Sequence, residues 1–307
     1  MEQKKRLMII DSNSLIHRAF HALPPLTTKK GDQVGAVYGF LLAFFKAIND
    51  FKPDFIVATF DVPSPTFRHK QFDFYKANRA KTPNELVHQI PLVKEVLDRF
   101  CIPFFGKEGF EADDLIGTIS RIAPKSQISP KLEVIILSGD ADLLQLVNDQ
   151  VKVYNLKRGV KNIVLYDIEK VREKYKGLFP EQLNDYKGLR GDPSDNVPGV
   201  PGIGEKTAID LISKFGNLEN IYEEIEKNTE KSKEIKQRIK EKLIENKNTA
   251  FISKKITKIK QDVPIEFNLQ ECIFGDYEKE DVIKKLKELE FSSLIDKIPV
   301  LEDLKED

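Results

Sequence analysis

The sequence has few of the residues that build disulfide frameworks, zinc sites or membrane spans. It contains 2 cysteines and 4 histidines among 307 residues, and Cys101 lies far from Cys272 in the chain. Two such cysteines make no framework, so a reducing cytoplasm is the expected location. No apolar run approaches the ~20 residues of a membrane-spanning helix, and the N-terminus has no signal-peptide core. We therefore expect a cytoplasmic protein with no membrane partner.

A net charge is also missing. The 49 basic and 49 acidic residues cancel, which argues against a simple polyanion binder. The two signs can still be segregated in space, as in a nuclease that needs acids for metals and bases for phosphates. One segment, 227–260, is strongly biased, with 12 Lys or Arg against 4 Glu. This bias indicates either a solvated helix face or a non-specific DNA-facing surface.

In the first 180 residues, apolar runs alternate with helical patterns. The first three runs are continuous rather than alternating, as in parallel strands covered by helices on both faces. Such alternation predicts an α/β fold, with a mostly parallel central sheet and flanking helices. The predicted strands are Leu7–Ile10, Phe55–Phe60, Val134–Leu137 and Val151–Leu156, and the predicted helices are Val37–Asn49, Glu85–Phe100 and Asp113–Ile122.

After about Pro180 the pattern becomes helical, with helices expected over Glu181–Gly188, Lys206–Phe215 and from Leu218 onward. We expect an α/β core over residues 1–180, a helix-hairpin-helix region over 181–262, and a C-terminal helical segment and tail over 263–307. A chain of this length can bury a full core as one large domain or two intimate ones.

Acidic residues stand where the predicted elements end. Ligands of open α/β sheets bind beyond the carboxyl ends of the strands, so these side chains are candidates for one crevice. Four follow strands, three open a helix and two follow a helix. The nine candidates are Asp11, Asp61, Asp140 and Asp142, then Glu111, Asp113 and Asp114, then Asp192 and Asp195.

Each of these acids alone has a structural explanation, as a helix cap or as common loop chemistry. Together they do not, because two carboxylates ~5 Å apart repel by ~3 kcal/mol at an effective dielectric of ~20. Gathering nine is costly without bound cations. All-oxygen ligands favour Mg²⁺ or Mn²⁺ over zinc. Two such ions can activate a water and stabilise the leaving oxygen of a phosphodiester displacement.

A glycine turn follows the last acids directly. Gly202-Ile-Gly204 lies between two helical segments, and Lys206 follows it. Exposed N–H groups at a helix start suit a sugar-phosphate backbone, so the turn predicts the hairpin of a helix-hairpin-helix.

The segment 67–81 mixes five bases with four aromatic residues, a combination that grips phosphates and stacks unpaired bases. Arg68, Tyr75, Lys76 and Arg79 are its candidate substrate-binding residues. On a helix, Lys76 and Arg79 would point the same way and could neutralise charge at a scissile phosphate, a catalytic role. In the alternative interpretation, the aromatics are core and the bases are solvated. The histidines, which are scattered, are expected to be non-catalytic.

In these residues the chain resembles the bacterial 5′→3′ exonuclease and flap endonuclease family, as in the N-terminal exonuclease domain of DNA polymerase I. The similarity runs in order from about residue 6 to 296. It is carried by Ile-Ile-Asp11-Ser, Ala-Val-Tyr-Gly-Phe at 36–40, Thr-Phe-Asp61, Phe-Arg68-His, Tyr75-Lys76-Ala-Asn-Arg79, Phe110-Glu111-Ala-Asp113-Asp114, Gly-Asp140-Ala-Asp142-Leu, Gly191-Asp192-Pro-Ser-Asp195, Gly202-Ile-Gly204-Glu-Lys-Thr-Ala and Leu-Glu-Phe-Ser-Ser-Leu at 289–294.

The resemblance implies two or three Mg²⁺ ions. Asp11, Asp61, Glu111 and Asp113 would mainly serve the first site. Asp142, Asp192 and Asp195 would serve the second, with Asp140 between the two and Asp114 acting through water. It also implies a PIN-like flap-nuclease fold, in which the segment near 66–100 forms a helical arch for a single-stranded 5′ end. The hairpin would hold duplex DNA, often with a bound K⁺.

The implied activity is Mg²⁺-dependent removal of 5′ ends, 5′ flaps and RNA primers by a monomer during replication and repair, leaving a 5′-phosphate and a 3′-hydroxyl. The polymerase that it serves would lie in the same chain or in another. Whether the chain is free-standing or a fragment of a polymerase stays open.

Three other classes fit parts of the pattern. A Toprim-type enzyme would lack the Asp192/Asp195 pair beside a hairpin. A phosphatase of the haloacid dehalogenase type needs an early nucleophilic Asp-x-Asp, whereas the first strand offers only Asp11-Ser-Asn. A DNA-bridging module with structural acids would not need all the ligand positions to be filled.

Overall fold

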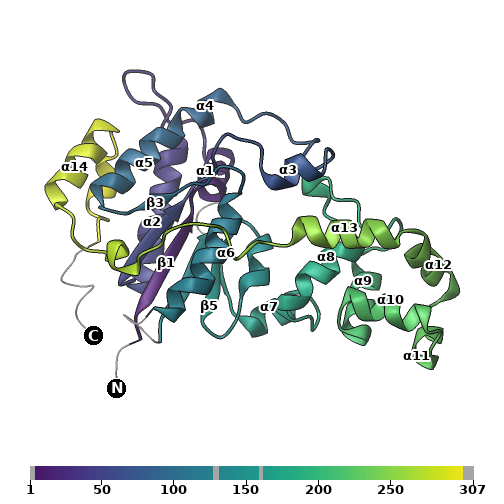
Figure 1. Ribbon diagram of the computed structural model, residues 1–307. Coiled ribbons are helices and arrows are strands. Elements are labelled where there is room, and N and C mark those ends of the chain that lie inside the picture. Colours follow the sequence, from purple (N-terminus) through teal and green to yellow (C-terminus); the bar gives the residue numbers. More distant parts are fainter. Residues whose placement is uncertain (1–3, 127–130, 159–161, 300–307) are drawn as a thin grey trace.

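A computed structural model describes residues 4–126, 131–158 and 162–299. A six-stranded sheet with the order β3-β2-β1-β4-β5-β6 lies at its centre (Figure 1). The first five strands run parallel and β6 pairs antiparallel with β5. The strands are β1 (Arg6–Asp11), β2 (Phe55–Thr59), β3 (Phe104–Phe105), β4 (Glu133–Ser138), β5 (Val151–Arg158) and β6 (Asn162–Tyr166).

The continuous apolar strands are buried on both faces, because side chains alternate across a sheet. In β1, Leu7 and Ile9 join one apolar cluster, while Met8 and Ile10 join the other. The first cluster lies under α6 (Ala112–Ile122). The opposite face is covered by α1 (Ser12–Ala22), α2 (Gly35–Phe51), α5 (Gln89–Arg99) and α14 (Lys279–Glu288). The predicted α/β class, with a mostly parallel sheet between helices, is confirmed.

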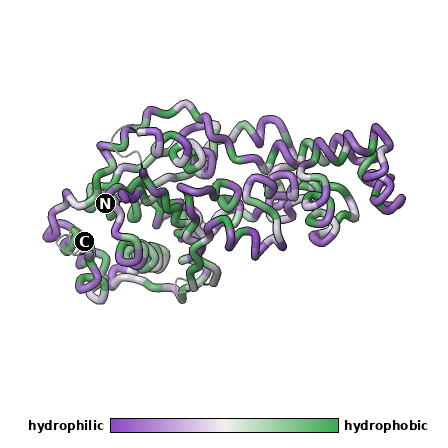
Figure 2. The backbone as a smooth tube through the Cα atoms, turned by 90° about the horizontal axis from the view of Figure 1, so that it is seen from below, coloured by the Kyte–Doolittle hydropathy of each residue, from purple (hydrophilic) through white to green (hydrophobic). Residues whose placement is uncertain are grey.

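Helices extend the molecule away from the sheet after residue 168 (Figure 1). Figure 2 shows hydrophilic residues prevailing at the far end of this extension, and hydrophobic residues concentrated around the sheet. In the part of the chain that the structure describes, no helix is long and apolar enough to cross a membrane. The helices of this extension are α7 (Ile168–Lys174), α8 (Leu183–Arg190), α9 (Glu205–Phe215), α10 (Leu218–Glu226), α11 (Glu230–Lys233), α12 (Gln237–Glu245) and α13 (Lys247–Thr257). The last helix, α15 (Ser292–Ile295), packs with α14 beside the sheet.

The segment 66–100 differs from the expected helices. The single helix predicted over Glu85–Phe100 is wrong: it is divided into α4 (Asn84–Val87) and α5, with the break at His88. Pro91 has no N–H to donate to the carbonyl of Val87, so one continuous helix would lose that bond. Upstream, α3 (Phe67–Gln71) is short, and residues 72–83 contain no helix.

Two strands were absent from the sequence-based prediction. β3 has only two residues, too few for a pattern, and β6 follows β5 after a short connection. The predicted division at residues 180 and 262 stays a prediction.

Candidate active site

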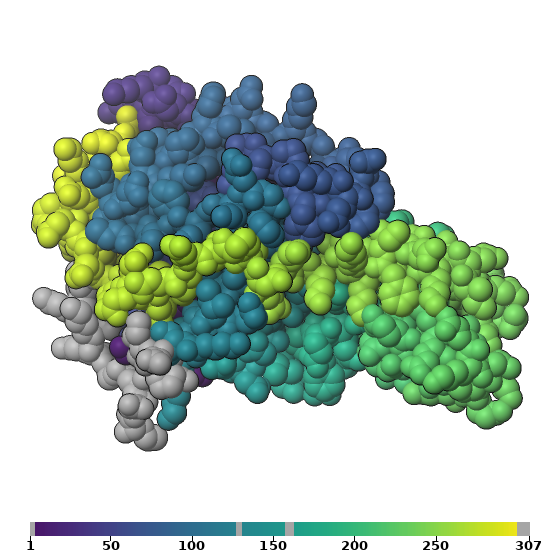
Figure 3. Space-filling model, in the orientation of Figure 1, coloured from purple at the N-terminus to yellow at the C-terminus, as the bar shows by residue number. Residues whose placement is uncertain are grey.

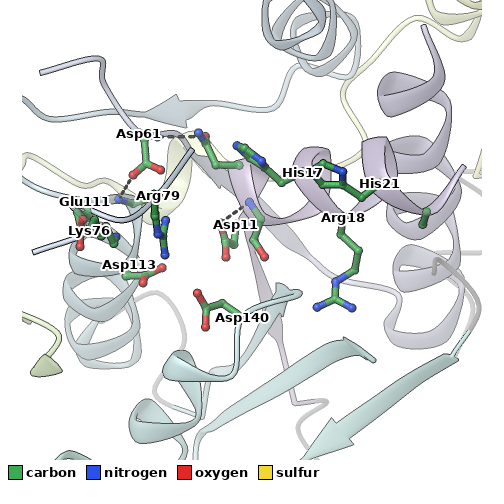
Figure 4. Close-up of a pocket in the computed structure, with 14 residues that line it drawn as sticks. Asp11, His17, Arg18, His21, Asp61, Lys76, Arg79, Glu111, Asp113 and Asp140 are labelled. Carbon is green, nitrogen blue, oxygen red and sulfur yellow. Dashed lines mark hydrogen bonds and ion pairs between the residues drawn. The ribbon is translucent and has the colours of Figure 1, made fainter. Parts of the chain in front are cut away.

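The carboxyl edge of the sheet gathers the predicted acids in one cavity. Asp11 ends β1, and Asp61 and Asp140 each lie two residues beyond the end of β2 and β4. Since β1 pairs in parallel with both β2 and β4, these three ends meet at one edge. They line a cavity of about 610 Å³ together with Glu111 and Asp113. Figure 4 shows Asp11, Asp113 and Asp140 directed toward the same space.

The start of α6 supplies the other two acids. Glu111 is the N-cap residue, in a capping box with Asp114, so the helix begins at the sheet edge. The Oδ1 atom of Asp61 accepts a hydrogen bond of 2.8 Å from the N–H of Ala112. This bond ties the end of β2 to the helix, whose N-terminus also stabilises negative charge.

Three of the carboxylates that line the cavity, Asp11, Asp61 and Asp113, resist ionisation. Burial, together with the nearby Asp140 and Asp61, raises the pKa of Asp11 to about 7. Burial and the charges of Asp140, Asp11 and Glu111 raise the pKa of Asp113 well above its usual range. The pKa of Asp61 is also raised, mainly by burial. Burial and, second to it, neighbouring carboxylates therefore disfavour the charged forms of these three acids.

Ser138 links two of the strand-end acids, and sequence reasoning did not identify it. Its hydroxyl donates to Asp11 at 2.5 Å and accepts the N–H of Asp140 at 2.8 Å. The residue is fully buried. A serine at the end of β4 carries no pattern of its own, so only the pairing of β1 with β4 reveals this role.

A second set of acids lies beside the cavity and shares one lysine. Lys187, on α8, forms ion pairs with Asp142 and, at 2.7 Å, with Asp192. Burial opposes ionisation of Asp192, but Lys187 and Ser194 outweigh it and lower its pKa to about 2. For Asp142 burial prevails over Lys187, and the pKa rises to about 6. The sequence analysis missed Lys187, which lies five residues before Asp192 in a helical pattern of ordinary charge.

The loop that carries Asp192 and Asp195 is held by two glycines. Gly191 and Gly199 have φ values of 75° and 60°, and a Cβ on Gly199 would lie 2.2 Å from the backbone N of Gly191. Only glycine allows both this conformation and this approach. The carboxylate of Asp195 accepts bonds from Arg79 at 2.5 Å and from the Tyr75 hydroxyl at 3.2 Å.

Lys76 and Arg79 both reach the acids, but not from a helix. Lys76 lies in a turn with φ at 55°, so the expected helical geometry is wrong. Its N–H donates to the carbonyl of Asp195 at 2.9 Å, and its Nζ lies 2.6 Å from Glu111 and 3.9 Å from Asp195. Both residues line the cavity. Together with Arg18, they are the lysine and arginine side chains that line this cavity.

Arg68 is not available to a substrate, and that prediction is wrong. It is 2% exposed and donates to Glu111, to both oxygens of Asp114 and to the carbonyls of Ile256 and Lys258. An arginine surrounded by acceptors in this way is a structural clamp.

Asp114 is fully buried, and its oxygens also accept the N–H groups of Glu111 and Lys260. It does not line the cavity. The structure therefore places this predicted ligand in the clamp, behind the other acids.

Tyr75 also lies inside. It is 5% exposed, and its hydroxyl bonds to Glu111 at 3.0 Å and to Asp195 at 3.2 Å. A buried ring offers no face to an unpaired base, so the predicted stacking role is wrong. The residue instead joins the two sets of acids.

One face of α1 forms the opposite wall, which sequence reasoning did not assign. Its side chains follow Asp11 at helical spacing, a signal that the sequence offered. His17 and His21, expected to be non-catalytic, are among them (Figure 4), and burial lowers the pKa of His17. Arg18 donates to the carbonyl of Gly139 at 2.7 Å. The wall consists of Asn13, Ser14, His17, Arg18, His21 and Ala22.

The glycine turn is exposed and lies between α8 and α9, as a helix-hairpin-helix requires. Gly202 has φ at 78°, Gly204 is the N-cap of α9, and Lys206 points outward from its first turn. The N–H groups at the start of α9 are thus open to solvent, as a phosphate contact would need.

Within residues 4–126, 131–158 and 162–299, no three His, Cys, Asp or Glu side chains are arranged to hold a metal ion. Lysine and arginine groups lie between several of the carboxylates instead. The donor set still matches a divalent cation, since five carboxylates and no thiol line one cavity.

Comparison with known families settles the affiliation. The family model described as "5'-3' exonuclease, N-terminal resolvase-like domain" matches residues 6–176, and "5'-3' exonuclease, C-terminal SAM fold" matches residues 178–280. The chain belongs to the 5′-3′ exonuclease family. Members of this family are phosphodiester hydrolases, so this 5′-3′ exonuclease is an enzyme of that class.

The relatives of this 5′-3′ exonuclease include DNA polymerase I of Bacillus subtilis, 42% identical over 298 residues, which are 97% of this chain and 33% of the relative. DNA polymerase I of Bacillus caldotenax is 43% identical over 295 residues, 96% of this chain and 32% of its own length. The chain thus spans about a third of the length of these relatives.

Solved structures share the fold over nearly the whole chain. The bacteriophage T5 D15 flap endonuclease, in a complex with DNA and metal ions, superposes with a TM-score of 0.67, 19% identity and 98% coverage of both chains. The catalytic core of Rad2, in complex with DNA substrate, gives 0.63 at 18% identity, covering 98% of this chain and 92% of its own. At these identities the likeness concerns the fold.

Proposed function

We propose that this chain is a Mg²⁺-dependent, structure-selective nuclease that removes 5′ ends and 5′ flaps from duplex DNA. The observation that carries the proposal is the cavity at the sheet edge. Five carboxylates from three strand ends and one helix start line it, with Lys76 and Arg79 beside them. Carboxylates suit divalent cations, and cations suit phosphates, so the cavity can hold both.

Asp11, Asp61, Glu111, Asp113 and Asp140 would hold a first ion, and Asp142, Asp192 and Asp195 a second. Mn²⁺ can substitute for Mg²⁺ at oxygen ligands of this kind. When bound, a pair of such ions supplies activation of a water and stabilisation of the leaving oxygen. The raised pKa values of Asp11 and Asp113 support this role, because a bound cation would stabilise the charged carboxylates that burial, and then the neighbouring acids, disfavour.

The chain's own cations would orient the substrate. Lys76 and Arg79 are placed to neutralise the scissile phosphate, and both can exchange a carboxylate for a phosphate oxygen without a change of backbone. Arg68 and Tyr75 would act as positioning residues, because they fix the carboxylate of Glu111 from behind.

The hairpin would hold the duplex at some distance from the cavity. Gly202, Gly204 and Lys206 are exposed around the N-terminus of α9, where backbone N–H groups suit phosphates. A bound K⁺ at this turn belongs to the same proposal. Contacts of this kind position DNA without reading its sequence.

In the cell this activity would remove RNA primers and displaced strands, and a DNA polymerase in the same or another chain would fill the gap. We propose that the chain acts as a monomer. The role beside a DNA polymerase and the monomeric state both rest on the family. The greater length of the polymerase relatives supports the role beside a polymerase.

Cleavage of a 5′-labelled flap substrate, with and without Mg²⁺, tests the proposal. We expect short labelled products only with the metal, and loss of cleavage in Asp192→Ala with flap binding kept within about three-fold. Asp276→Ala, an exposed aspartate outside the cavity, is the control. Metal-independent cleavage, or full activity in Asp192→Ala, would reject the two-metal assignment.

A further inference from the structure

A second hollow lies on the other side of the Arg68 clamp from the acidic cavity. It has a volume of about 610 Å³ and lies between α3, the start and end of α6, and the segment 258–262 that follows α13. This segment crosses the face shown in Figure 3, below the residues of α3. Arg68 connects the two hollows, since it bonds to Glu111 on one side and to the carbonyl of Lys258 on the other.

The hollow continues into a smaller one of about 340 Å³, because Arg121 and Gln261 line both. Together they form an elongated groove, which we name the lysine-aromatic groove. Its basic residues are Arg121, Lys125, Lys255, Lys258 and Lys260, its acidic residues are Glu181 and Asp262, and its aromatic residues are Phe67 and Phe110.

The groove carries uncompensated positive charge. Its five basic residues face two acids, and within residues 4–126, 131–158 and 162–299 none of the five forms an ion pair with a carboxylate, although Lys258 lies close enough to Glu219 to lower the pKa of that acid. Some other lysines of the same basic segment are paired with glutamates on the helix surface. Lys227, Lys233 and Lys247 are paired with Glu223, Glu230 and Glu226. A solvated helix face explains those paired lysines, whereas the groove keeps its cations available.

Aromatic rings lie at one end of the groove. Phe67 and Phe110 are half-buried, with ring centroids 6.0 Å apart, and the Nζ of Lys260 lies 4.9 Å from the Phe67 ring. Rings beside unpaired cations are the combination that binds unpaired bases and their phosphates. Duplex DNA would contact such a groove through its phosphates alone, because its bases are paired and do not stack on aromatic side chains.

We infer that the lysine-aromatic groove binds the single-stranded 5′ tail of the substrate, beyond the phosphate that is cut. The inference rests on the proposed function, because that function supplies a substrate with such a tail. The chemical class of ligand is unpaired nucleic acid of several nucleotides, held without sequence preference.

Binding of fluorescent duplexes with 5′ tails of 0, 4 and 12 thymidines tests this. A chelator prevents cleavage. For the unaltered chain we expect affinity to rise with tail length, by about 10-fold or more at low salt. The variant Lys255→Ala/Lys258→Ala/Lys260→Ala should lose this rise. Its slope of log affinity against log salt should fall by about 2 on the longest tail, at about 0.7 per lost phosphate contact.

The control variant Lys279→Ala/Lys284→Ala/Lys287→Ala removes the same charge from α14, and should keep the tail dependence. Lys260→Ala alone should lower the slope by about 0.7, which guards against misfolding of the triple variant. Equal behaviour of the two triple variants, or no tail dependence in the unaltered chain, overturns the inference. So does an equal loss for the tail-free duplex, which would assign the groove to duplex DNA.

Failure of the proposed nuclease function would be seen separately, as absent cleavage of a flap in Mg²⁺. The binding measurement contains no metal and does not depend on that outcome.

Discussion

Two sets of carboxylates meet beside the sheet, and they are neutralised differently. The first set, which we name the strand-end set, consists of three acids at strand ends and two at the start of α6, and burial leaves Asp11 with a pKa of about 7. Its members are Asp11, Asp61, Asp140, Glu111 and Asp113. The lysine-bridged set, Asp142 and Asp192, shares Lys187, and Asp192 has a pKa of about 2. One set therefore stores repulsion, while the other contains its own counterion.

The difference follows from where the sets are built. The ends of parallel strands converge whatever the charge of their side chains, and protonation or a bound cation can relieve the resulting repulsion between carboxylates. The second set forms where α8 of the helical extension reaches the edge of the sheet, and a helix can carry a lysine there. In the first set, the charged acids that metal binding needs therefore lower the stability of the metal-free protein. In the second set, the shared lysine offsets part of that cost.

The largest effect should come from the strand-end set. Asp113→Asn should reduce single-turnover cleavage by about 10³-fold, since it removes a negatively charged ligand of the proposed first metal ion. Without metal the same change should raise the free energy of unfolding by about 1 kcal/mol, because it removes repulsion. Urea denaturation in a chelator measures this, with Asp276→Asn as control. Unchanged cleavage by Asp113→Asn would contradict the catalytic role assigned to the strand-end set.

Lys76 lies between the two sets, and its loss should rank next. Lys76→Ala should slow single-turnover cleavage by about 10²-fold, the scale of one electrostatic contact, with flap binding within a few-fold. The exposed lysine Lys284→Ala is the control. An unchanged rate would return Lys76 to a purely structural role as the partner of Glu111.

Removal of the shared counterion should make the second set resemble the first. Lys187→Met should lower the free energy of unfolding by about 3 kcal/mol in a chelator, because Asp142 and Asp192 lose their common partner. Saturating Mg²⁺ should restore part of this by binding the folded state. Chemical denaturation with and without metal gives both values, and Lys284→Met should show neither. Equal stability of Lys187→Met and the unaltered chain would remove the counterion role.

Asp11 and Asp192 should also give pH dependences of opposite sign, which is the smallest of the expected effects, while Asp142, with a pKa raised to about 6, should act in the same direction as Asp11. Asp11 has a folded pKa of about 7 against 3.8, so the folded state binds the proton more tightly and metal-free stability should fall as pH rises through that window. For Asp192, about 2 against 3.8, stability should fall as pH drops below about 4. Denaturation midpoints from pH 2 to 8 report both. A flat profile between pH 4 and 7 would contradict the repulsion assigned to the strand-end set.

Local patterns were sufficient for the sheet edge. Continuous apolar runs predicted β1, β2 and β4, and an aspartate after each run placed Asp11, Asp61 and Asp140 at one edge, because parallel strands point the same way. The glycine turn could also be predicted from a local pattern, since Gly202 has a positive φ that few other residues tolerate. The metal assignment of these acids stays a prediction.

The partners of charged side chains could not be predicted from the sequence. Arg68 and Lys76 have similar sequence surroundings in a basic segment. Arg68 is nevertheless buried and bonded to Asp114, 46 residues away, whereas Lys76 reaches the cavity. Tyr75 read as a stacking residue and is buried. The pairing of Lys187 with Asp142 depends on how α8 meets the sheet.

The sequence by itself determined which acids follow strands. It also determined that these acids converge, because continuous apolar runs predict parallel strands, and the carboxyl ends of parallel strands lie at one edge of the sheet. Only the tertiary structure decided which charges are buried, which are paired, and which cations stay available in the lysine-aromatic groove. Those outcomes depend on packing between segments far apart in the chain, where a shift of a few ångströms separates an ion pair from a solvated charge.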